Sequence, residues 1–224
     1  MKFARMRKNT RVSTLSVACL LSSLALAGEP STNRPASWAQ PIALAGVPNL
    51  HQVSTDLYRS AQPSAEGMQN LKRKGIKTIV NLRSFHSDRD EIGNLGLGYE
   101  HITMKAWHPE RKEVVRFLQI VTNPERTPVL VHCQHGADRT GTLSALYRVA
   151  VQGWAKDEAI QEMSEGGFGF HKIWGNLPNW IENLDIETIQ QDAGIDTQTG
   201  EPPGAQPPEA PSKSSEPAKP VGAN

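Results

Sequence analysis

The chain has few cysteines, and their positions limit what they can do. Only two occur among 224 residues: Cys19 in an apolar stretch near the N-terminus and Cys133 in the middle of the chain. A small fold held together by disulfides needs several pairs of cysteines. This composition therefore excludes a disulfide framework and leaves a single thiol in the main part of the chain.

An excess of charge of one sign is also missing. The 24 Lys and Arg residues nearly balance the 23 Asp and Glu residues, which gives a net charge of +1 and a pI of about 7.8. No basic stripe with interleaved aromatic residues occurs, and removal of the basic N-terminus would make the chain more acidic. Nucleic acid is therefore not an expected partner.

Long apolar runs are absent except for one short run at residues 12–26. Five basic residues precede it, and Ala25-Leu26-Ala27 has the small-x-small pattern of a cleavage site. The run is shorter than the about 20 residues of a membrane-spanning helix. Residues 1–27 are therefore predicted to be a secretory signal peptide that directs the protein to the periplasm.

Two alternatives remain for this segment. An uncleaved segment would act as a membrane anchor, and it would be the only membrane contact. Lipidation at Cys19 is the other alternative, although Ser16 fits a lipoprotein signal poorly. In an exported chain, the lone thiol of Cys133 would be exposed to oxidation. Its presence therefore predicts a chemical role.

Cys133 lies in a segment, residues 127–141, that combines a strand, a loop and the start of a helix. Val129–Val131 is a short β-branched run typical of a buried strand, and apolar residues recur at helical spacing from residue 143 to 150. The backbone N–H groups of such a loop and the helix N-terminus favour a bound phosphate. They also favour the nucleophilic thiolate form of Cys133, and Arg139 adds a planar guanidinium that can bind two phosphate oxygens.

The string His132-Cys133-x5-Arg139-Thr140-Gly141 resembles the signature of the Cys-based protein tyrosine phosphatases, in particular their dual-specificity branch. Residues 57–63 and 75–83 resemble the opening of bacterial, fungal and plant members of that branch. The resemblance implies a phosphomonoesterase with a phosphocysteine intermediate and no metal or other cofactor. Its substrate would be a phosphorylated protein, lipid or small molecule.

The resemblance also implies a role for each residue of the loop. Cys133 would be the nucleophile, and Arg139 would bind the phosphoryl group. His132 would orient the loop, and Thr140 would stabilise the sulfur as it leaves. The residues whose backbone N–H groups would surround the phosphate are Gln134, His135, Gly136, Ala137, Asp138 and Arg139.

The general acid is harder to identify. Related enzymes usually carry an Asp on a separate loop before the Cys, but the corresponding stretch here, residues 105–110, contains none. Asp138 occupies the place where myotubularin-like phosphatases carry an Asp in the loop itself, so it is the expected acid. Glu110 and His108 are the alternatives, and Asp138 could instead brace the loop. Lys105, Arg83 and His135 are candidates for widening the positive field around the site.

Other interpretations of the loop stay open. Cys133 could be a buried structural cysteine, or the chain could bind phosphate without catalysis, although binding alone does not require a thiol. His132, Cys133 and His135 could bind zinc, but adjacent strand residues point to opposite faces and chelate poorly. The substrate is also open between phosphotyrosine, phosphoserine, a phospholipid headgroup and an inositol phosphate. The loop lacks the lysines with which polyphosphoinositide phosphatases usually bind additional phosphates.

Alternating strand and helix patterns predict a single α/β domain with a central, mainly parallel sheet flanked by helices. Residues 28–46 are predicted to be a linker, 47–190 the phosphatase domain, and 197–224 a disordered Pro-rich tail. Within the domain, the patterns predict a hairpin at 49–59, a helix from Ser64 to Lys74, and a strand at 76–82. A capping box at Ser87 and Asp90 predicts a short helix through Leu95.

Overall fold

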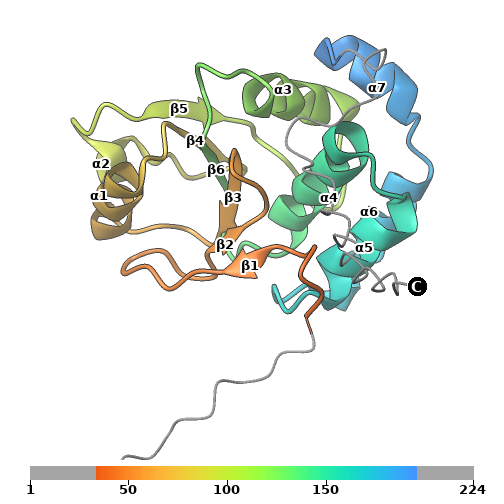
Figure 1. Ribbon diagram of the computed structural model, residues 1–224, viewed down its shortest axis with the longest axis horizontal. Coiled ribbons are helices and arrows are strands. Elements are labelled where there is room, and N and C mark those ends of the chain that lie inside the picture. The colour runs from red at the N-terminus through yellow and green to blue at the C-terminus, as the bar shows by residue number, and fades with distance from the viewer. Residues whose placement is uncertain (1–33, 196–224) are drawn as a thin grey trace, which may run out of the picture. The chain divides into compact units, whose positions relative to one another are not determined.

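The computed structural model describes residues 34–195, which form a six-stranded sheet with helices on both faces (Figure 1). The strands are β1 (Gln40–Pro41), β2 (His51–Gln52), β3 (Leu57–Ser60), β4 (Thr78–Asn81), β5 (Gly98–His101) and β6 (Val129–His132). The helices are α1 (Ala65–Lys74), α2 (Arg89–Ile92), α3 (Arg111–Val121), α4 (Asp138–Gln152), α5 (Lys156–Glu165), α6 (Asn176–Glu182) and α7 (Ile186–Ala193), with a 3-10 turn η1 (Lys172–Trp174).

The strand order is β1-β2-β3-β6-β4-β5. Strands β3, β6, β4 and β5 run parallel, whereas β1 pairs antiparallel with β2, and β2 pairs antiparallel with β3. The prediction of a mainly parallel sheet in one α/β domain is therefore confirmed. Because β6 lies between β3 and β4, the loop that follows it emerges from the middle of the carboxyl edge, where such sheets place ligands.

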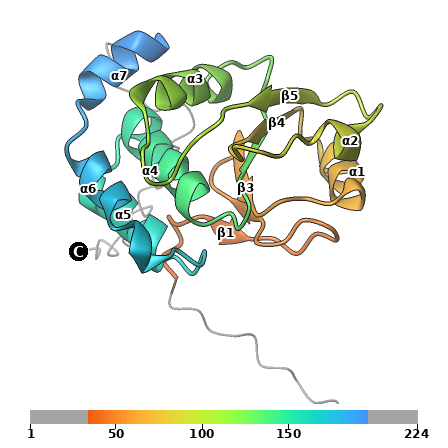
Figure 2. The same ribbon diagram turned by 180° about the vertical axis from the view of Figure 1, so that it is seen from behind.

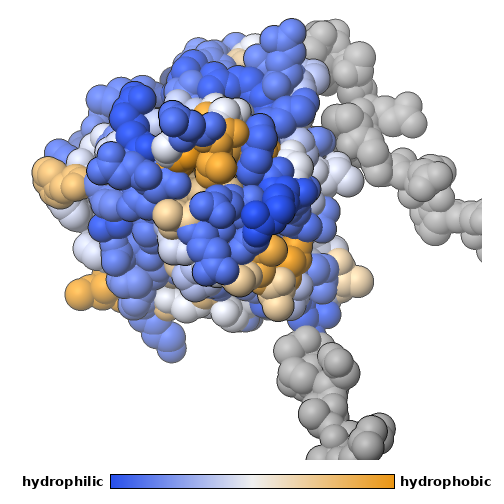
Figure 3. Space-filling model, turned by 90° about the vertical axis from the view of Figure 1, so that its left-hand side faces the viewer, coloured by the Kyte–Doolittle hydropathy of each residue, from blue (hydrophilic) through white to orange (hydrophobic). Residues whose placement is uncertain are grey.

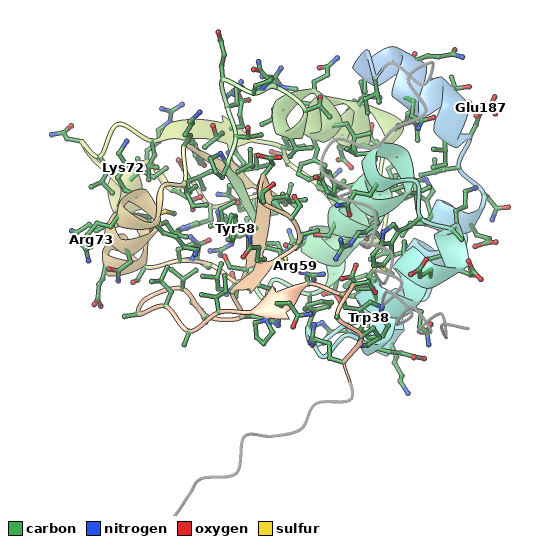
Figure 4. All side chains as sticks on the ribbon, viewed as in Figure 1. Trp38, Tyr58, Arg59, Lys72, Arg73 and Glu187 are labelled. Carbon is green, nitrogen blue, oxygen red and sulfur yellow. The ribbon has the colours of Figure 1, made fainter. Side chains whose placement is uncertain are left out.

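Successive side chains of the central strands point to opposite faces of the sheet, so the core has two layers. Val129 and Val131 of β6 face the core of α3 to α7, and Leu130 faces the core that includes α1. Strand β3 follows the same rule, since Tyr58 lies on the α1 side and Arg59 on the side of α4 and α5 (Figure 4). The reverse view also places α1 and α2 apart from α4, α5 and α6 (Figure 2).

Helix α1 agrees with its predicted span because its ends are encoded locally. The Ser64 hydroxyl accepts a hydrogen bond from the Gly67 N–H at 3.1 Å, and Gly75 ends the helix with a φ of 97°. Met68 and Leu71 are buried, while Lys72 and Arg73 point to solvent. The side of the molecule that carries α1 and α2 is mainly hydrophilic, with separate small hydrophobic areas (Figure 3).

The predicted linker, residues 28–46, is wrong for its described part. Strand β1 pairs with β2, and the buried Ala39 donates its N–H to Glu162 at 2.6 Å, so the domain includes residues from Arg34 onward. A two-residue strand in a Pro-containing stretch has no periodicity that would reveal it. At the other end, α7 extends past residue 190 and is capped by Gly194.

The predicted signal peptide and Pro-rich tail lie outside the described residues. Among residues 34–195, no helix combines the length and the apolar character needed to cross a membrane.

His51 on β2 makes the stability of this domain depend on pH. Its ring is buried against Phe168, with centroids 4.8 Å apart. Burial, together with the positive charges of Arg59 and Arg34, lowers the pKa of His51 to about 4. In the unfolded chain the value is about 6.5, so below that pH the unfolded state binds a proton that the folded state does not.

We therefore expect this group to remove up to about 3 kcal/mol from the free energy of unfolding between pH 6.5 and 4. Urea unfolding at pH 7 and pH 4.5 measures the loss. His51→Gln cannot titrate, so its loss between pH 7 and pH 4.5 should be smaller by about 2.5 kcal/mol. Equal losses in the two proteins would contradict this prediction.

Candidate active site

The loop at residues 133–137 connects the end of β6 to the start of α4. It carries Cys133, a free thiol that is only 2% exposed. Helix α4 begins at Asp138, so its unpaired N–H groups and the positive end of its dipole lie at the loop. The expected strand–loop–helix arrangement around Cys133 is therefore present, with a local environment suited to an anion.

Gly136 lets this loop pack directly on the end of β3. Its φ is 69°, and a Cβ at this position would lie 2.4 to 2.5 Å from backbone atoms of Ser60 and Ala61. Those atoms cannot move away without breaking the pairing of β3 with β6. Only glycine therefore fits here, for both conformational and steric reasons.

We expect Gly136→Ala to lower the free energy of unfolding by about 3 kcal/mol or more, because backbone strain adds to overpacking. It should also displace the loop and reduce turnover of an aryl phosphate. Gly75→Ala is the matched control, since Gly75 also has a positive φ but a Cβ there meets nothing within 4 Å. Urea unfolding and turnover of both variants provide the measurement, and equal costs would show that the contact with β3 is unimportant.

Arg59 of β3 supports the loop through hydrogen bonds to its carbonyl oxygens. It is 1% exposed, and its Nη2 donates to the carbonyl oxygens of Gly136 at 2.8 Å and Ala137 at 3.5 Å. Its guanidinium also lies 3.6 Å from the ring centroid of Phe168. Burial lowers the pKa of Arg59 to about 10, so it stays protonated at neutral pH.

These contacts fix the direction of the loop peptides. In a trans peptide the N–H points away from the carbonyl, so the N–H groups of Ala137 and Asp138 point away from Arg59. Arg59 belongs to one of the resembling segments, but no motif in the sequence indicates a role for it. In the sequence it is simply a charged residue within a strand, and such a residue is normally expected to be exposed.

His132 is held by a carboxylate that sequence reasoning missed. Its Nε2 lies 2.7 Å from Oδ2 of Asp88, and its Nδ1 lies 3.4 Å from the Cys133 carbonyl oxygen. Burial opposes ionisation of Asp88, but hydrogen bonds from His132 and Gln62 outweigh it and hold its pKa below the usual range. Asp88 precedes α2, and Ser87 does not cap that helix as predicted, because α2 begins only at Arg89.

A cavity of about 470 Å³ opens beside the loop. Arg139 lies in its wall, where Nη1 donates to the carbonyl oxygens of Leu82 at 3.2 Å and Met104 at 3.5 Å. Large, exposed apolar side chains stand around it, notably Phe85, Trp107 and Ile173. The residues that line the cavity are Arg83, Ser84, Phe85, Ala106, Trp107, Gln134, His135, Asp138, Arg139, His171, Ile173 and Trp174.

The three candidate acids differ in position. Asp138 lines the cavity and is 7% exposed, whereas Glu110 and His108 do not line it. Glu110 is paired with Lys112 at 2.6 Å and takes part in the N-terminal capping of α3. Asp138 contacts His171, a residue that belongs to no motif in the sequence.

The remaining predicted residues also surround the loop. Arg83 and His135 line the cavity, and Lys105 does not. Thr140 is fully buried, and its Oγ1 has no hydrogen-bond partner among the described residues. This free hydroxyl next to the loop is therefore available to form a hydrogen bond with a group that is present in only part of a reaction cycle.

Metal-binding atoms gather in one place within residues 34–195. Ligand atoms of His86, Asp88 and Glu91 lie within 4.8 Å of one another, but both Asp88 oxygens already accept hydrogen bonds from Gln62 and His132. The bond to Asp88 also occupies Nε2 of His132, so the zinc alternative for His132, Cys133 and His135 would have only Nδ1 of His132 left. The geometry around Cys133 therefore suits a nucleophile better than a metal ligand.

Known proteins that resemble this chain are phosphatases. Residues 48–174 match the family described as DSP-PTPase phosphatase fused to NAD+ kinase. The chain is similar to the dual specificity protein phosphatase TpbA of Pseudomonas aeruginosa strain PAO1, with 36% identity over 177 residues, 77% of this chain and 78% of that protein.

Solved structures agree. The crystal structure of P. aeruginosa TpbA has a TM-score of 0.64 at 33% identity, covering 71% of this chain and 98% of that chain. The catalytic core of the PP-IP phosphatase SIW14 from S. cerevisiae has a TM-score of 0.60 at 25% identity, covering 68% and 94%. Because the family match spans more than half of the chain and carries the Cys and Arg of the loop, the chain belongs to the Cys-based dual-specificity phosphatase family and is a Cys-dependent phosphatase.

Proposed function

We propose that the physiological substrate is a phosphotyrosine-type aryl phosphate monoester. The observation that carries this proposal is the wall of the cavity, where apolar and aromatic side chains of Phe85, Trp107 and Trp174 stand beside Arg139. An aromatic ring attached to the phosphate would be buried against such a wall. A variant of TpbA was crystallised with phosphotyrosine, which supports the same class.

An inositol pyrophosphate is the second candidate, because SIW14 is named as a PP-IP phosphatase. A ligand with several phosphates needs several cations around it. Among residues 34–195, the only Lys or Arg residues that line the cavity are Arg83 and Arg139. We therefore expect a phosphotyrosine peptide to exceed an inositol pyrophosphate in kcat/KM by about tenfold or more. The reverse order in a substrate panel would favour the second candidate.

In this proposal each residue of the loop has one role. The Cys133 thiolate attacks phosphorus, so an S–P bond forms as the P–O bond to the leaving group breaks. Loop N–H groups and Arg139 stabilise the charge on the three transferring oxygens. The free hydroxyl of Thr140 then donates a hydrogen bond to the sulfur while water hydrolyses the phosphocysteine. The proton for the leaving group comes from the pair formed by Asp138 and His171, which both line the cavity.

This chemistry needs no metal ion, which gives a direct test. Hydrolysis of p-nitrophenyl phosphate should continue at an unchanged rate in EDTA, because the phosphoryl charge is neutralised by protein groups. Vanadate, which resembles the transferring phosphoryl group, should compete with substrate. Loss of activity on chelation, restored by added zinc, would contradict a metal-independent mechanism.

We also propose that the protein is exported and that residues 1–27 are removed. The basic residues, the short apolar run and Ala25-Leu26-Ala27 support this proposal. Protein recovered from cells should then begin near Gly28 and contain one titratable thiol. Full-length protein in the cytosolic fraction, with Met1 intact, would contradict it.

A further inference from the structure

Asp138, the expected general acid, is already engaged by another side chain. The backbone N–H of His171 donates to its Oδ1 at 2.9 Å. The Nδ1 atom of the same residue lies 3.1 Å from Oδ1 and 2.9 Å from Oδ2. The Asp138 side chain is 10% exposed and the His171 side chain is 48% exposed. The two residues are 33 positions apart in the sequence, so only the fold brings them together.

This geometry assigns different tasks to the two groups. A carboxylate that accepts two N–H bonds is an acceptor, and Nδ1 of His171 is then the protonated ring nitrogen that donates to it. No hydrogen bond within residues 34–195 involves Nε2 of His171. Asp138 therefore has little capacity left to donate a proton, whereas the imidazole offers Nε2 and is open to proton exchange with solvent.

The backbone around His171 is fixed by the same residues that support the loop. Phe168 lies between Arg59, at 3.6 Å, and His51, at 4.8 Å. The carbonyl oxygen of Phe168 accepts a hydrogen bond from Asn49 at 2.9 Å, and Asn49 also donates to the His135 carbonyl at 3.0 Å. His171 is thus held in a defined position relative to the loop, and it lines the same cavity as Arg139.

We propose that His171 is the general acid of the reaction and that Asp138 is a positioning residue that orients its ring. This inference rests on the phosphatase mechanism above. When the P–O bond breaks, Nε2 of the imidazolium gives its proton to the leaving oxygen and the ring becomes neutral. In the second step the neutral ring takes a proton from the attacking water as the S–P bond breaks. The thiolate and the imidazolium are then regenerated.

Other charged groups set the surroundings of this imidazole. Asp138 faces it from α4 and accepts the hydrogen bond of Nδ1 at 2.9 Å. His135 faces it from the loop, with ring centroids 5.3 Å apart, and Arg83 and Arg139 line the same cavity. A bound phosphate dianion would offset the positive charges of these two arginines.

The test is His171→Asn, assayed with leaving groups of increasing basicity. A good leaving group such as p-nitrophenolate departs without full protonation, and phenolate or an alkoxide does not. We expect less than a tenfold loss of kcat on p-nitrophenyl phosphate and a loss of roughly 10²-fold or more on phenyl phosphate. The alkaline limb of the kcat profile on phenyl phosphate should flatten, because the group that must be protonated is gone.

Three comparisons separate this inference from its alternatives. The double variant Asp138→Asn/His171→Asn should lose no more than His171→Asn, because Asp138 acts through the ring. His108→Asn, an imidazole outside the cavity lining, should keep the wild-type dependence on the leaving group. Unchanged vanadate inhibition of His171→Asn would show that the loop is intact. The inference is wrong if His171→Asn lowers kcat equally for all leaving groups while Asp138→Asn makes kcat depend more strongly on the basicity of the leaving group. Asp138 would then donate the proton directly. A wild-type protein without phosphatase activity would instead refute the proposed function.

Discussion

Cys133→Ser is expected to abolish turnover, by roughly 10⁴-fold or more, while leaving the affinity for phosphate esters nearly unchanged. A serine hydroxyl is not ionised by the loop and is a poor nucleophile at neutral pH. Binding depends on the loop N–H groups and on Arg139, which the substitution does not alter. Turnover of p-nitrophenyl phosphate and calorimetric titration with phosphotyrosine measure the two effects separately.

The other thiol provides the control. Cys19 belongs to the proposed signal peptide, so Cys19→Ser in the precursor should leave the activity of the mature protein unchanged. If Cys133→Ser retained a substantial part of the wild-type rate, the nucleophile would have to be another group, and the phosphocysteine mechanism would be wrong. If it lost both turnover and affinity, Cys133 would be needed for the structure of the loop.

Arg139→Lys is expected to lower kcat by roughly 10³-fold even though the charge is kept. A lysine cannot contact two phosphoryl oxygens with a planar group. It also cannot keep the bonds that Nη1 makes to the Leu82 and Met104 carbonyls, which fix the direction of the side chain. The loss should be mainly in kcat, because charge on the transferring oxygens is greatest in the transition state.

Arg83→Lys is the matched control, since Arg83 lines the same cavity but does not belong to the loop. Its effect should be smaller and should be seen mainly in KM, through weaker attraction of the substrate. Steady-state kinetics of both variants on one aryl phosphate separate the two patterns. Equal losses of kcat would mean that the cavity acts through its overall charge and that the geometry of Arg139 is unimportant.

The sequence alone identified the features that depend on neighbouring residues. Ser64 and Gly75 bound α1 because a hydroxyl at the N-cap and a glycine at the C-cap act within one turn of the chain. The hairpin at 49–59 corresponds to β2 and β3, and the run Val129–Val131 is the buried central strand. The full string from His132 to Gly141 also indicated the family.

The tertiary structure alone revealed the residues that support and complete the site. Asp88 reaches His132 across 44 positions, Arg59 reaches Gly136 across 77, and His171 reaches Asp138 across 33. Such pairs depend on strand register and on the path of the connecting segments, and neither leaves a periodic pattern in the sequence. A buried arginine, or a histidine in a turn between helices, looks in sequence like any solvated residue. The cysteine and arginine were therefore predictable, whereas the groups that hold the loop and the proposed source of the proton required the fold.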